Sequence, residues 1–224
     1  MKIIAHRGAS RECPENTFAA FDRALEIGVD AIETDVQITR DGHCVLRHDD
    51  IILKEGQYCY INELTLEELL SIDLGQGERV PTLLEFLEKY EGRLPLMLEA
   101  KDHRATEALI QCLAASRQPG MLHVTSFLFS VIREVRKRLP ELGTSIVMAA
   151  LPPDPSSIFK QVPTKEISLF RGFLTRELVQ GLKGNGHTVR AYTVNWPREA
   201  MTLASWGVDA VFTDDPRAMR NLKS

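Results

Sequence analysis

The chain alternates between short apolar runs and segments in which apolar residues recur every three or four positions. The runs are rich in Val, Ile and Leu, as buried strands are, and the spaced segments are typical of helices that pack on one face. The clearest helix spans residues 128–139, and its apolar stripe consists of Leu128, Val131, Ile132, Val135 and Leu139. We therefore expect strands and helices to alternate along most of the chain.

The apolar runs predict eight strands, at residues 1–6, 31–36, 94–100, 122–127, 144–149, 167–170, 188–194 and 210–213. The spaced segments predict helices at residues 17–27, 82–90, 104–116, 128–139, 176–185 and 197–206, with a last helix from Pro216. Alternating strands and helices imply a parallel sheet, and eight such units in 224 residues imply a closed barrel. The predicted fold class is α/β, a TIM (β/α)8 barrel that forms a single domain over residues 1–224.

One segment after the second strand interrupts this alternation. The turn residues 39–42 (Thr-Arg-Asp-Gly) precede residues 44–48, which read as the second arm of a hairpin. So short a connection cannot be a parallel crossover, which needs about a dozen residues. Residues 50–80 look irregular apart from a short helix near residues 66–72. We expect a small insertion, a hairpin plus a short helix, over about residues 37–80.

The charge balance argues against nucleic acid as the main partner, because the formal net charge is -4 and no basic run occurs. The first residues read as a strand and not as a signal peptide, and no apolar run reaches membrane-spanning length. The four cysteines lack metal-binding spacing, so we expect reduced thiols. The sequence thus predicts a cytoplasmic protein without stable membrane insertion and leaves assembly into a homo-oligomer open.

Two acidic residues interrupt the second strand, which reads Ala-Ile-Glu-Thr-Asp-Val over residues 31–36. Residues two apart in a strand point to the same face, so Glu33 and Asp35 are expected side by side. In an interior strand, two like charges are costly unless a cation or hydrogen-bond donors meet them. The alternative is an exposed edge strand with two solvated acids.

The C-terminal ends of the strands, where such barrels carry their sites, hold polar residues in this chain. They are His6, Arg7, Glu33, Asp35, Glu99, Lys101, Tyr192 and Asp214, and the hairpin adds His48. Three carboxylates make a hard-oxygen site suited to Mg²⁺ or Ca²⁺. Two histidines can serve as base and acid. Two nearby cations, Arg7 and Lys101, point to an anionic substrate, most naturally a phosphate.

Seven motifs carry these residues, in chain order. They are Ala5-His6-Arg7-Gly8, Pro14-Glu15-Asn16-Thr17, Glu33-Thr34-Asp35-Val36, His48-Asp49, Leu98-Glu99-Ala100-Lys101, Tyr192-Thr193-Val194-Asn195 and Thr213-Asp214-Asp215-Pro216. Together they resemble the glycerophosphodiester phosphodiesterase family over nearly the whole chain. The resemblance implies an α/β barrel with an insertion after the second strand. It also implies hydrolysis of small-molecule glycerophosphodiesters to an alcohol and glycerol 3-phosphate.

The same resemblance implies a role for each group of residues. The divalent-metal positions, for Mg²⁺ or Ca²⁺, fall on Glu33, Asp35 and Glu99. The acid–base pair falls on His6 and His48. The substrate contacts fall on Arg7, Lys101 and Tyr192. A cyclic phosphate, formed by attack of the substrate's own 2-hydroxyl, is the implied intermediate.

Some readings stay open at this level. Residues 51–56 (Ile-Ile-Leu-Lys-Glu-Gly) stand where many relatives carry Asp-Arg-Thr-Thr, so the substrate contacts of the insertion are undetermined. Lys101 could be a structural partner of Glu99. One rival function is a related barrel phospholipase that acts on lysophospholipids, which requires an apolar rim that the sequence does not clearly contain. The other is a non-catalytic barrel that binds a phosphorylated ligand.

Overall fold

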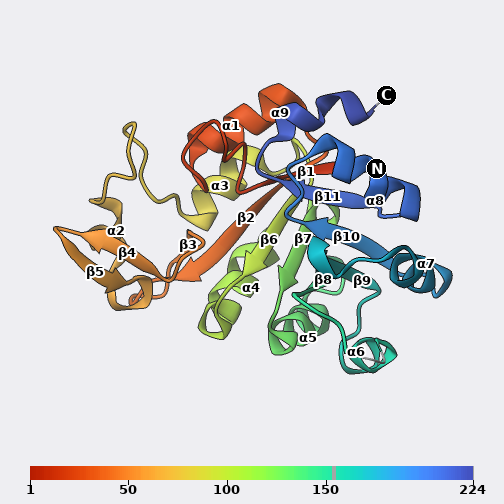
Figure 1. The fold of residues 1–224 in the computed structure, drawn as a ribbon. Coiled ribbons are helices and arrows are strands. Elements are labelled where there is room, and N and C mark those ends of the chain that lie inside the picture. Colours follow the sequence, from red (N-terminus) through yellow and green to blue (C-terminus); the bar gives the residue numbers. More distant parts are fainter. Residues whose placement is uncertain (153–154, 224) are drawn as a thin grey trace.

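The structure, a computed structural model, describes residues 1–152 and 155–223. Within these ranges eight parallel strands close into a barrel that helices surround (Figure 1). The strands are β1 (Lys2–His6), β2 (Ala31–Ile38), β6 (Leu96–Ala100), β7 (Leu122–Ser126), β8 (Gly143–Met148), β9 (Glu166–Phe170), β10 (Thr188–Tyr192) and β11 (Ala210–Thr213). Strand β1 pairs with both β2 and β11, which closes the sheet. The predicted TIM barrel is confirmed.

Helix α1 (Phe18–Ile27) illustrates how local sequence sets helix limits. The Thr17 hydroxyl accepts a hydrogen bond from the Ala20 amide, and Gly28 ends the helix with φ 81°. The other α-helices are α2 (Leu66–Leu70), α3 (Leu83–Tyr90), α4 (Thr106–Ala114), α5 (Phe129–Arg138), α6 (Ser156–Gln161), α7 (Arg176–Gly184), α8 (Pro197–Trp206) and α9 (Pro216–Met219). Short 3-10 turns are η1 (Ile61–Glu63), η2 (His103–Ala105), η3 (Pro119–Met121), η4 (Arg171–Phe173) and η5 (Arg220–Lys223). None of the helices in the described ranges is long and apolar enough to span a membrane.

The insertion after β2 contains more regular structure than the sequence suggested. Strand β3 (Cys44–Leu46) runs antiparallel to β2, as predicted. Strands β4 (Ile51–Lys54) and β5 (Gln57–Tyr60) then form a second, two-stranded sheet. The prediction of irregular structure over residues 50–80 was therefore wrong for this hairpin. In Figure 1 the hairpin and α2 stand to the left of the barrel.

The insertion has an apolar cluster of its own. It consists of Val45, Ile52, Ile61, Leu64, Leu69 and Val80. In β4, Ile52 is buried while its neighbours Ile51 and Leu53 are exposed, so one face of the small sheet packs inward. Residues Glu55 and Gly56 both have positive φ, which matches the tight turn between the two strands. The segment thus packs around an apolar cluster of its own beside the barrel.

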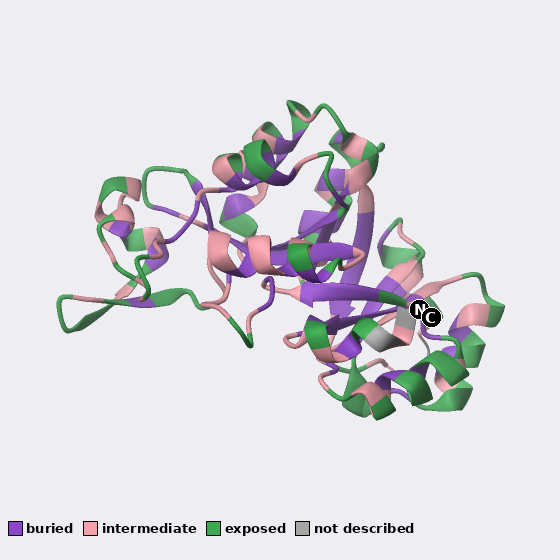
Figure 2. Cartoon of the chain, turned by 90° about the horizontal axis from the view of Figure 1, so that it is seen from above, coloured by how far each residue is buried: buried purple, intermediate pink, exposed green. Residues whose placement is uncertain are grey.

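Buried residues concentrate on the barrel strands and on the inner faces of the surrounding helices (Figure 2). Around β2 the core is reinforced by three fully buried rings, Phe21, Phe86 and Tyr90. The rings of Phe21 and Phe86 meet edge to face with centroids 4.7 Å apart. The hydroxyl of Tyr90 donates to Asp22 at 2.8 Å, so its polar end is satisfied. This packing holds α1 and α3 against the strand that carries two acids.

The register of the strands brings the polar strand ends together. His6 on β1 lies opposite Glu33 on β2. Asp35, two residues further along β2, lies opposite Glu99 on β6. Because alternate residues of a strand share a face, the three acids face the same side of the sheet at the C-terminal end of the barrel.

Candidate active site

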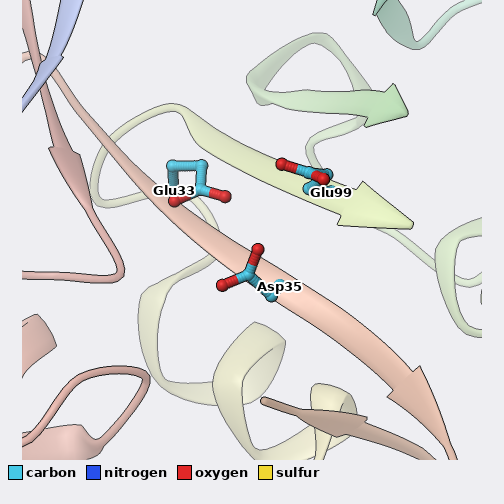
Figure 3. A group of neighbouring side chains, drawn as sticks. All are labelled: Glu33, Asp35 and Glu99. Carbon is cyan, nitrogen blue, oxygen red and sulfur yellow. The ribbon is translucent and has the colours of Figure 1, made fainter. Parts of the chain in front are cut away.

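Three buried carboxylates converge from two neighbouring strands. Glu33 and Asp35 come from β2 and Glu99 from β6, and Figure 3 shows the three side chains facing the space between these strands. One oxygen of each lies within 4.8 Å of the others. Glu33 is 1% exposed and Asp35 is fully buried. Since β2 also lies between β1 and β6, the alternative of a solvated edge strand was wrong.

Burial raises the pKa values of two of these acids. It raises the pKa of Glu33 to about 8, with the charge of Asp35 as a second cause. It also raises the pKa of Glu99. One oxygen of Glu33 accepts a hydrogen bond from the Arg7 amide at 3.0 Å, but Oε1 is buried without a hydrogen-bond partner among the described residues. Such an oxygen is costly to bury unless a cation or a water molecule meets it.

Asp35 is compensated by charges within the protein. Lys101 Nζ lies 3.0 Å from Asp35 Oδ1 and 2.6 Å from Glu99 Oε1. On the other side, Arg7 Nε lies 3.1 Å from Asp35 Oδ2, and the Asn16 amide donates to the same oxygen at 2.9 Å. Burial alone raises the pKa of Asp35, but Lys101 and Arg7 outweigh it and lower that pKa. The lysine thus pairs with Glu99, one of the readings that the sequence left open, and with Asp35 as well.

The loop after β1 shapes this arrangement through an unusual backbone. Arg7 and Gly8 both have positive φ, 58° and 81°. A Cβ on Gly8 would lie 2.6 Å from the carbonyl carbon of Ala20 in α1, so no other residue fits there. The turn aims the Arg7 amide at Glu33, while Nη1 of the same residue lies 2.9 Å from Glu15. The His-Arg-Gly motif is therefore a requirement of backbone geometry as well as of side-chain chemistry.

His6 is held by a carboxylate on the opposite side from the three acids. Its Nδ1 lies 2.6 Å from Asp214 Oδ1, and Asn195 donates to the other oxygen of Asp214 at 2.7 Å. Burial tends to raise the pKa of Asp214, yet the hydrogen bond from His6 keeps that pKa low. Burial likewise tends to lower the pKa of His6, but Asp214 and the charge of Glu33 raise it. An ionised carboxylate only accepts, so Nδ1 carries the proton and neutral His6 offers Nε2 as a base.

The two histidines line different cavities. His6 shares a small cavity in the barrel mouth with Glu33, Glu99 and Tyr192. His48 lines an open cavity of about 510 Å³ together with Lys101. Its Nδ1 lies 2.8 Å from Asp49 Oδ1. Among the described residues, no hydrogen bond or ion pair joins His48 to the three acids. Lys101 lies between the two groups, because it contacts the acids and also borders the cavity of His48.

Comparison with known proteins shows which family this chain resembles. The sequence profile of the glycerophosphoryl diester phosphodiesterase family matches residues 6–218. The chain belongs to this family. A glycerophosphodiester phosphodiesterase of Caldanaerobacter subterraneus subsp. tengcongensis is 33% identical over 98% of this chain and 96% of its own length. The structure of this chain resembles that of an Oleispira antarctica phosphodiesterase in complex with the product sn-glycerol-3-phosphate, with a TM-score of 0.93 and 28% identity, covering 100% of this chain and 97% of that one.

A second solved structure extends the likeness within the family. A glycerophosphodiester phosphodiesterase from Parabacteroides distasonis gives a TM-score of 0.87 at 26% identity, covering 99% of this chain and 95% of that one. The family resemblance that the motifs suggested is therefore confirmed, as is the enzyme class of phosphoric diester hydrolase.

The three acids of this family member fit a hard divalent cation. Carboxylate oxygens are the preferred ligands of Mg²⁺ and Ca²⁺, and Glu33 Oε1, which has no hydrogen-bond partner among the described residues, would be available as a ligand atom. Lys101 now neutralises part of the negative charge of Asp35 and Glu99. If a cation enters, Glu33, Asp35 and Glu99 would hold it.

Three residues of the site had no role assigned from the sequence. Asn16, with φ 56°, accepts from the Thr34 hydroxyl at 2.7 Å and donates to Asp35. Asp214 and Asn195 form the support of His6. All three lie inside motifs of the family, so the signal was present. The sequence did not show which of these residues contact one another. His6 and Asp214 lie together only because β1 pairs with β11.

Proposed function

We propose that the protein hydrolyses glycerophosphodiesters to an alcohol and sn-glycerol 3-phosphate with the help of a divalent cation. The observation that carries this proposal is the buried cluster of Glu33, Asp35 and Glu99 beside His6. The Oleispira relative, solved with the product sn-glycerol-3-phosphate, supports the same chemistry. When bound, the cation would neutralise negative charge that develops on the phosphoryl oxygens.

The geometry supports separate roles for the two histidines. His6 takes a proton through Nε2, since its Nδ1 is fixed on Asp214 and the carboxylate stabilises the imidazolium that forms. His48 protonates the departing alcohol from the open cavity, where its side chain is 36% exposed. The proton that His6 accepts comes from the substrate's 2-hydroxyl, which attacks phosphorus to give a cyclic phosphate. Water then opens the ring with the two roles reversed.

Cationic residues of the site would hold the phosphate. Arg7 and Lys101 reach the acids from two sides, and each is only partly exposed. A phosphodiester entering between them would meet two positively charged side chains, and charge-assisted hydrogen bonds to phosphate are strong. Tyr192 presents a ring in the same mouth, on which the glycerol carbons can rest.

The rival of a non-catalytic phosphate-binding barrel accounts poorly for the acids. An anion-binding site gains nothing from two buried carboxyl groups whose pKa values are raised by burial. A divalent cation held by Glu33, Asp35 and Glu99 would offset their charge and would remove this conflict. The arrangement thus favours a metal-assisted hydrolase.

The first experiment tests the cation. The protein is freed of metal with a chelator, and release of glycerol 3-phosphate from glycerophosphocholine is followed with and without Mg²⁺ or Ca²⁺. We expect activity to vanish on chelation and to return with either cation. Glu33→Gln should prevent the recovery, whereas Glu107→Gln, which removes an exposed acid paired with Arg138, should not. Full turnover in excess chelator would refute the cation hypothesis.

A second experiment tests the internal nucleophile. Glycerophosphocholine is compared with its 2-deoxy analogue. Loss of an oriented intramolecular nucleophile can forfeit as much as about 7–11 kcal/mol, whereas one lost binding hydrogen bond costs about 0.5–1.5 kcal/mol. We expect a collapse of kcat with a nearly unchanged inhibition constant for the analogue. Equal kcat values would mean that water attacks phosphorus directly.

A further inference from the structure

The cavity of about 510 Å³ that His48 borders has walls from two distant parts of the chain. The insertion supplies Asp49 and Asp50, and residues 101–104, which follow β6, supply the opposite wall. The carbonyl of Asp50 accepts a hydrogen bond from the Ile61 amide at 2.8 Å. The fold of the insertion therefore holds Asp50 at the edge of this cavity.

The proposed reaction determines which part of the substrate enters the cavity. His48 protonates the departing alcohol, so the oxygen of that alcohol must come within hydrogen-bond reach of the imidazole. The phosphate stays beside Lys101, which borders the cavity and also contacts the buried acids. The head group therefore extends from the phosphate into the cavity, and the side chains of its walls meet whatever charge the head group carries.

Most charged side chains of the cavity already have a partner of opposite charge. Asp49 Oδ1 lies 2.8 Å from His48 Nδ1. Asp102 accepts from Arg104 Nε at 2.7 Å and lies 2.6 Å from Arg104 Nη2. The charge of Lys101 is offset by two of the buried acids. Each lysine and arginine of the walls is thus matched by a carboxylate.

Asp50 is the exception to this pairing. Its side chain is exposed, and it makes no hydrogen bond or ion pair within residues 1–152 and 155–223. The pKa of Arg104 is raised mainly by its hydrogen bond to Asp102, and the charge of Asp50 adds to this effect. The two carboxylates therefore lie near one guanidinium, which can neutralise only one of them. The cavity keeps one negative charge in excess, and that charge belongs to Asp50.

We propose that Asp50 makes the enzyme select glycerophosphodiesters whose alcohol carries a positive charge, such as choline or ethanolamine. This specificity rests on the proposed phosphodiesterase function and assigns the residue that distinguishes head groups. An ammonium group near Asp50 is attracted by the unmatched carboxylate, whereas an uncharged alcohol of the same shape is not. A primary ammonium group also donates a charge-assisted hydrogen bond to it.

Two substrates of the same shape isolate the contribution of the charge. Glycerophosphocholine is compared with the glycerophosphodiester of 3,3-dimethylbutanol, in which a carbon atom replaces the quaternary nitrogen. Release of glycerol 3-phosphate, the product of both, gives the ratio of the two kcat/KM values. We expect Asp50→Asn to lower this ratio about three- to fivefold at low ionic strength, the scale of one exposed charge pair in water. The difference should vanish in about 1 M salt, which screens exposed charges.

Two further variants show whether the effect belongs to Asp50. Asp50→Lys should lower the ratio beyond the value for Asp50→Asn, because attraction of the head group is replaced by repulsion. Glu67→Gln removes an exposed acid of α2 that does not border the cavity, and this control should keep the ratio of the unmodified enzyme. Thermal unfolding shows that each variant is folded.

The possible outcomes separate the inference from the function on which it rests. If both substrates are hydrolysed and the ratio is the same in the unmodified enzyme, Asp50→Asn and Asp50→Lys, the inference is wrong. An equal fall of the ratio in Glu67→Gln would assign the selection to the overall charge of the insertion and would also overturn it. If a folded, metal-loaded enzyme releases glycerol 3-phosphate from neither substrate, the proposed function itself fails.

Discussion

The carboxylate that supports His6 offers a sharp test of the site. In Asp214→Asn the side chain keeps its size but loses its charge. Asp214 now accepts from His6 on one oxygen and from Asn195 on the other. Asn195 cannot reverse its amide to suit, because its oxygen accepts from the Asp214 backbone amide at 2.8 Å and from Thr213. The side-chain amide of an asparagine at this position would therefore point its N–H toward either His6 or Asn195, both of which donate, and one of the two hydrogen bonds would be lost.

The size of the effect follows from the contact. A hydrogen bond to a charged partner contributes about 1.5–3 kcal/mol, which corresponds to about one to two pKa units. Asp214 is 35% exposed, so solvent screens the pair and the lower end applies. The variant loses the hydrogen bond that contributes most to raising the pKa of His6, while burial continues to lower that pKa. We expect the pKa of His6 to fall in this variant. Because the imidazole also loses its orientation, kcat should fall by about 10²-fold or more.

The assay combines a pH profile with a matched control. If His6 acts as a base when neutral, the acid limb of kcat/KM should lie above the ordinary histidine pKa and should move to lower pH in Asp214→Asn. Asp215→Asn removes the same charge one residue later, where the side chain caps α9, and asparagine also caps helices well. This control should leave kcat and the acid limb in place. An unmoved limb in Asp214→Asn, or an equal loss in the control, would refute the reasoning.

Three further predictions address the metal, the second histidine and the loop. Glu33→Gln should weaken the affinity for Mg²⁺ or Ca²⁺ by about tenfold or more, because a charged ligand is lost. Calorimetric titration measures this affinity, and an unchanged value would exclude Glu33 as a ligand. His48→Ala should lower kcat by about 10²-fold in steady-state assays, and near-native turnover would remove its assigned role. Gly8→Ala should lower the free energy of unfolding by about 2–4 kcal/mol, through positive φ and the clash with Ala20. Gly56→Ala is the control in urea denaturation, because Gly56 has the same φ of 81° but an added Cβ would meet no atom within 4 Å. Equal losses of unfolding free energy in the two variants would contradict the steric argument.

The barrel could be predicted from the sequence because its signals are local. Apolar runs and amphipathic segments recur in order, and Thr17 and Gly28 mark the limits of α1 as capping residues do. The convergence of Glu33 and Asp35 also follows from strand periodicity alone. Once a parallel barrel is assumed, Glu99 must join them, since every strand ends at the same rim.

The rest depends on contacts that no local pattern encodes. The β4–β5 hairpin was missed because its residues combine exposed Ile51 and Leu53 with a Glu-Gly turn, which lacks the usual Asn-Gly or Asp-Gly signal. The support of His6 by Asp214 joins residues 208 positions apart. The contacts of the Tyr192 ring with Phe127 and Phe170 likewise form only once the ends of β7, β9 and β10 have been brought to one rim.

The separate apolar cluster of the insertion has a consequence for how this enzyme can diversify. Substitutions around Ile52 or Leu69 repack that small cluster and leave the interior of the barrel untouched. The hairpin can therefore change in sequence, become longer or be exchanged while the acids keep their register on β2 and β6. This division explains how residues 51–56 can depart from the run that many relatives carry without loss of the catalytic framework. An insertion grafted from a relative onto this barrel should therefore leave the acids in register.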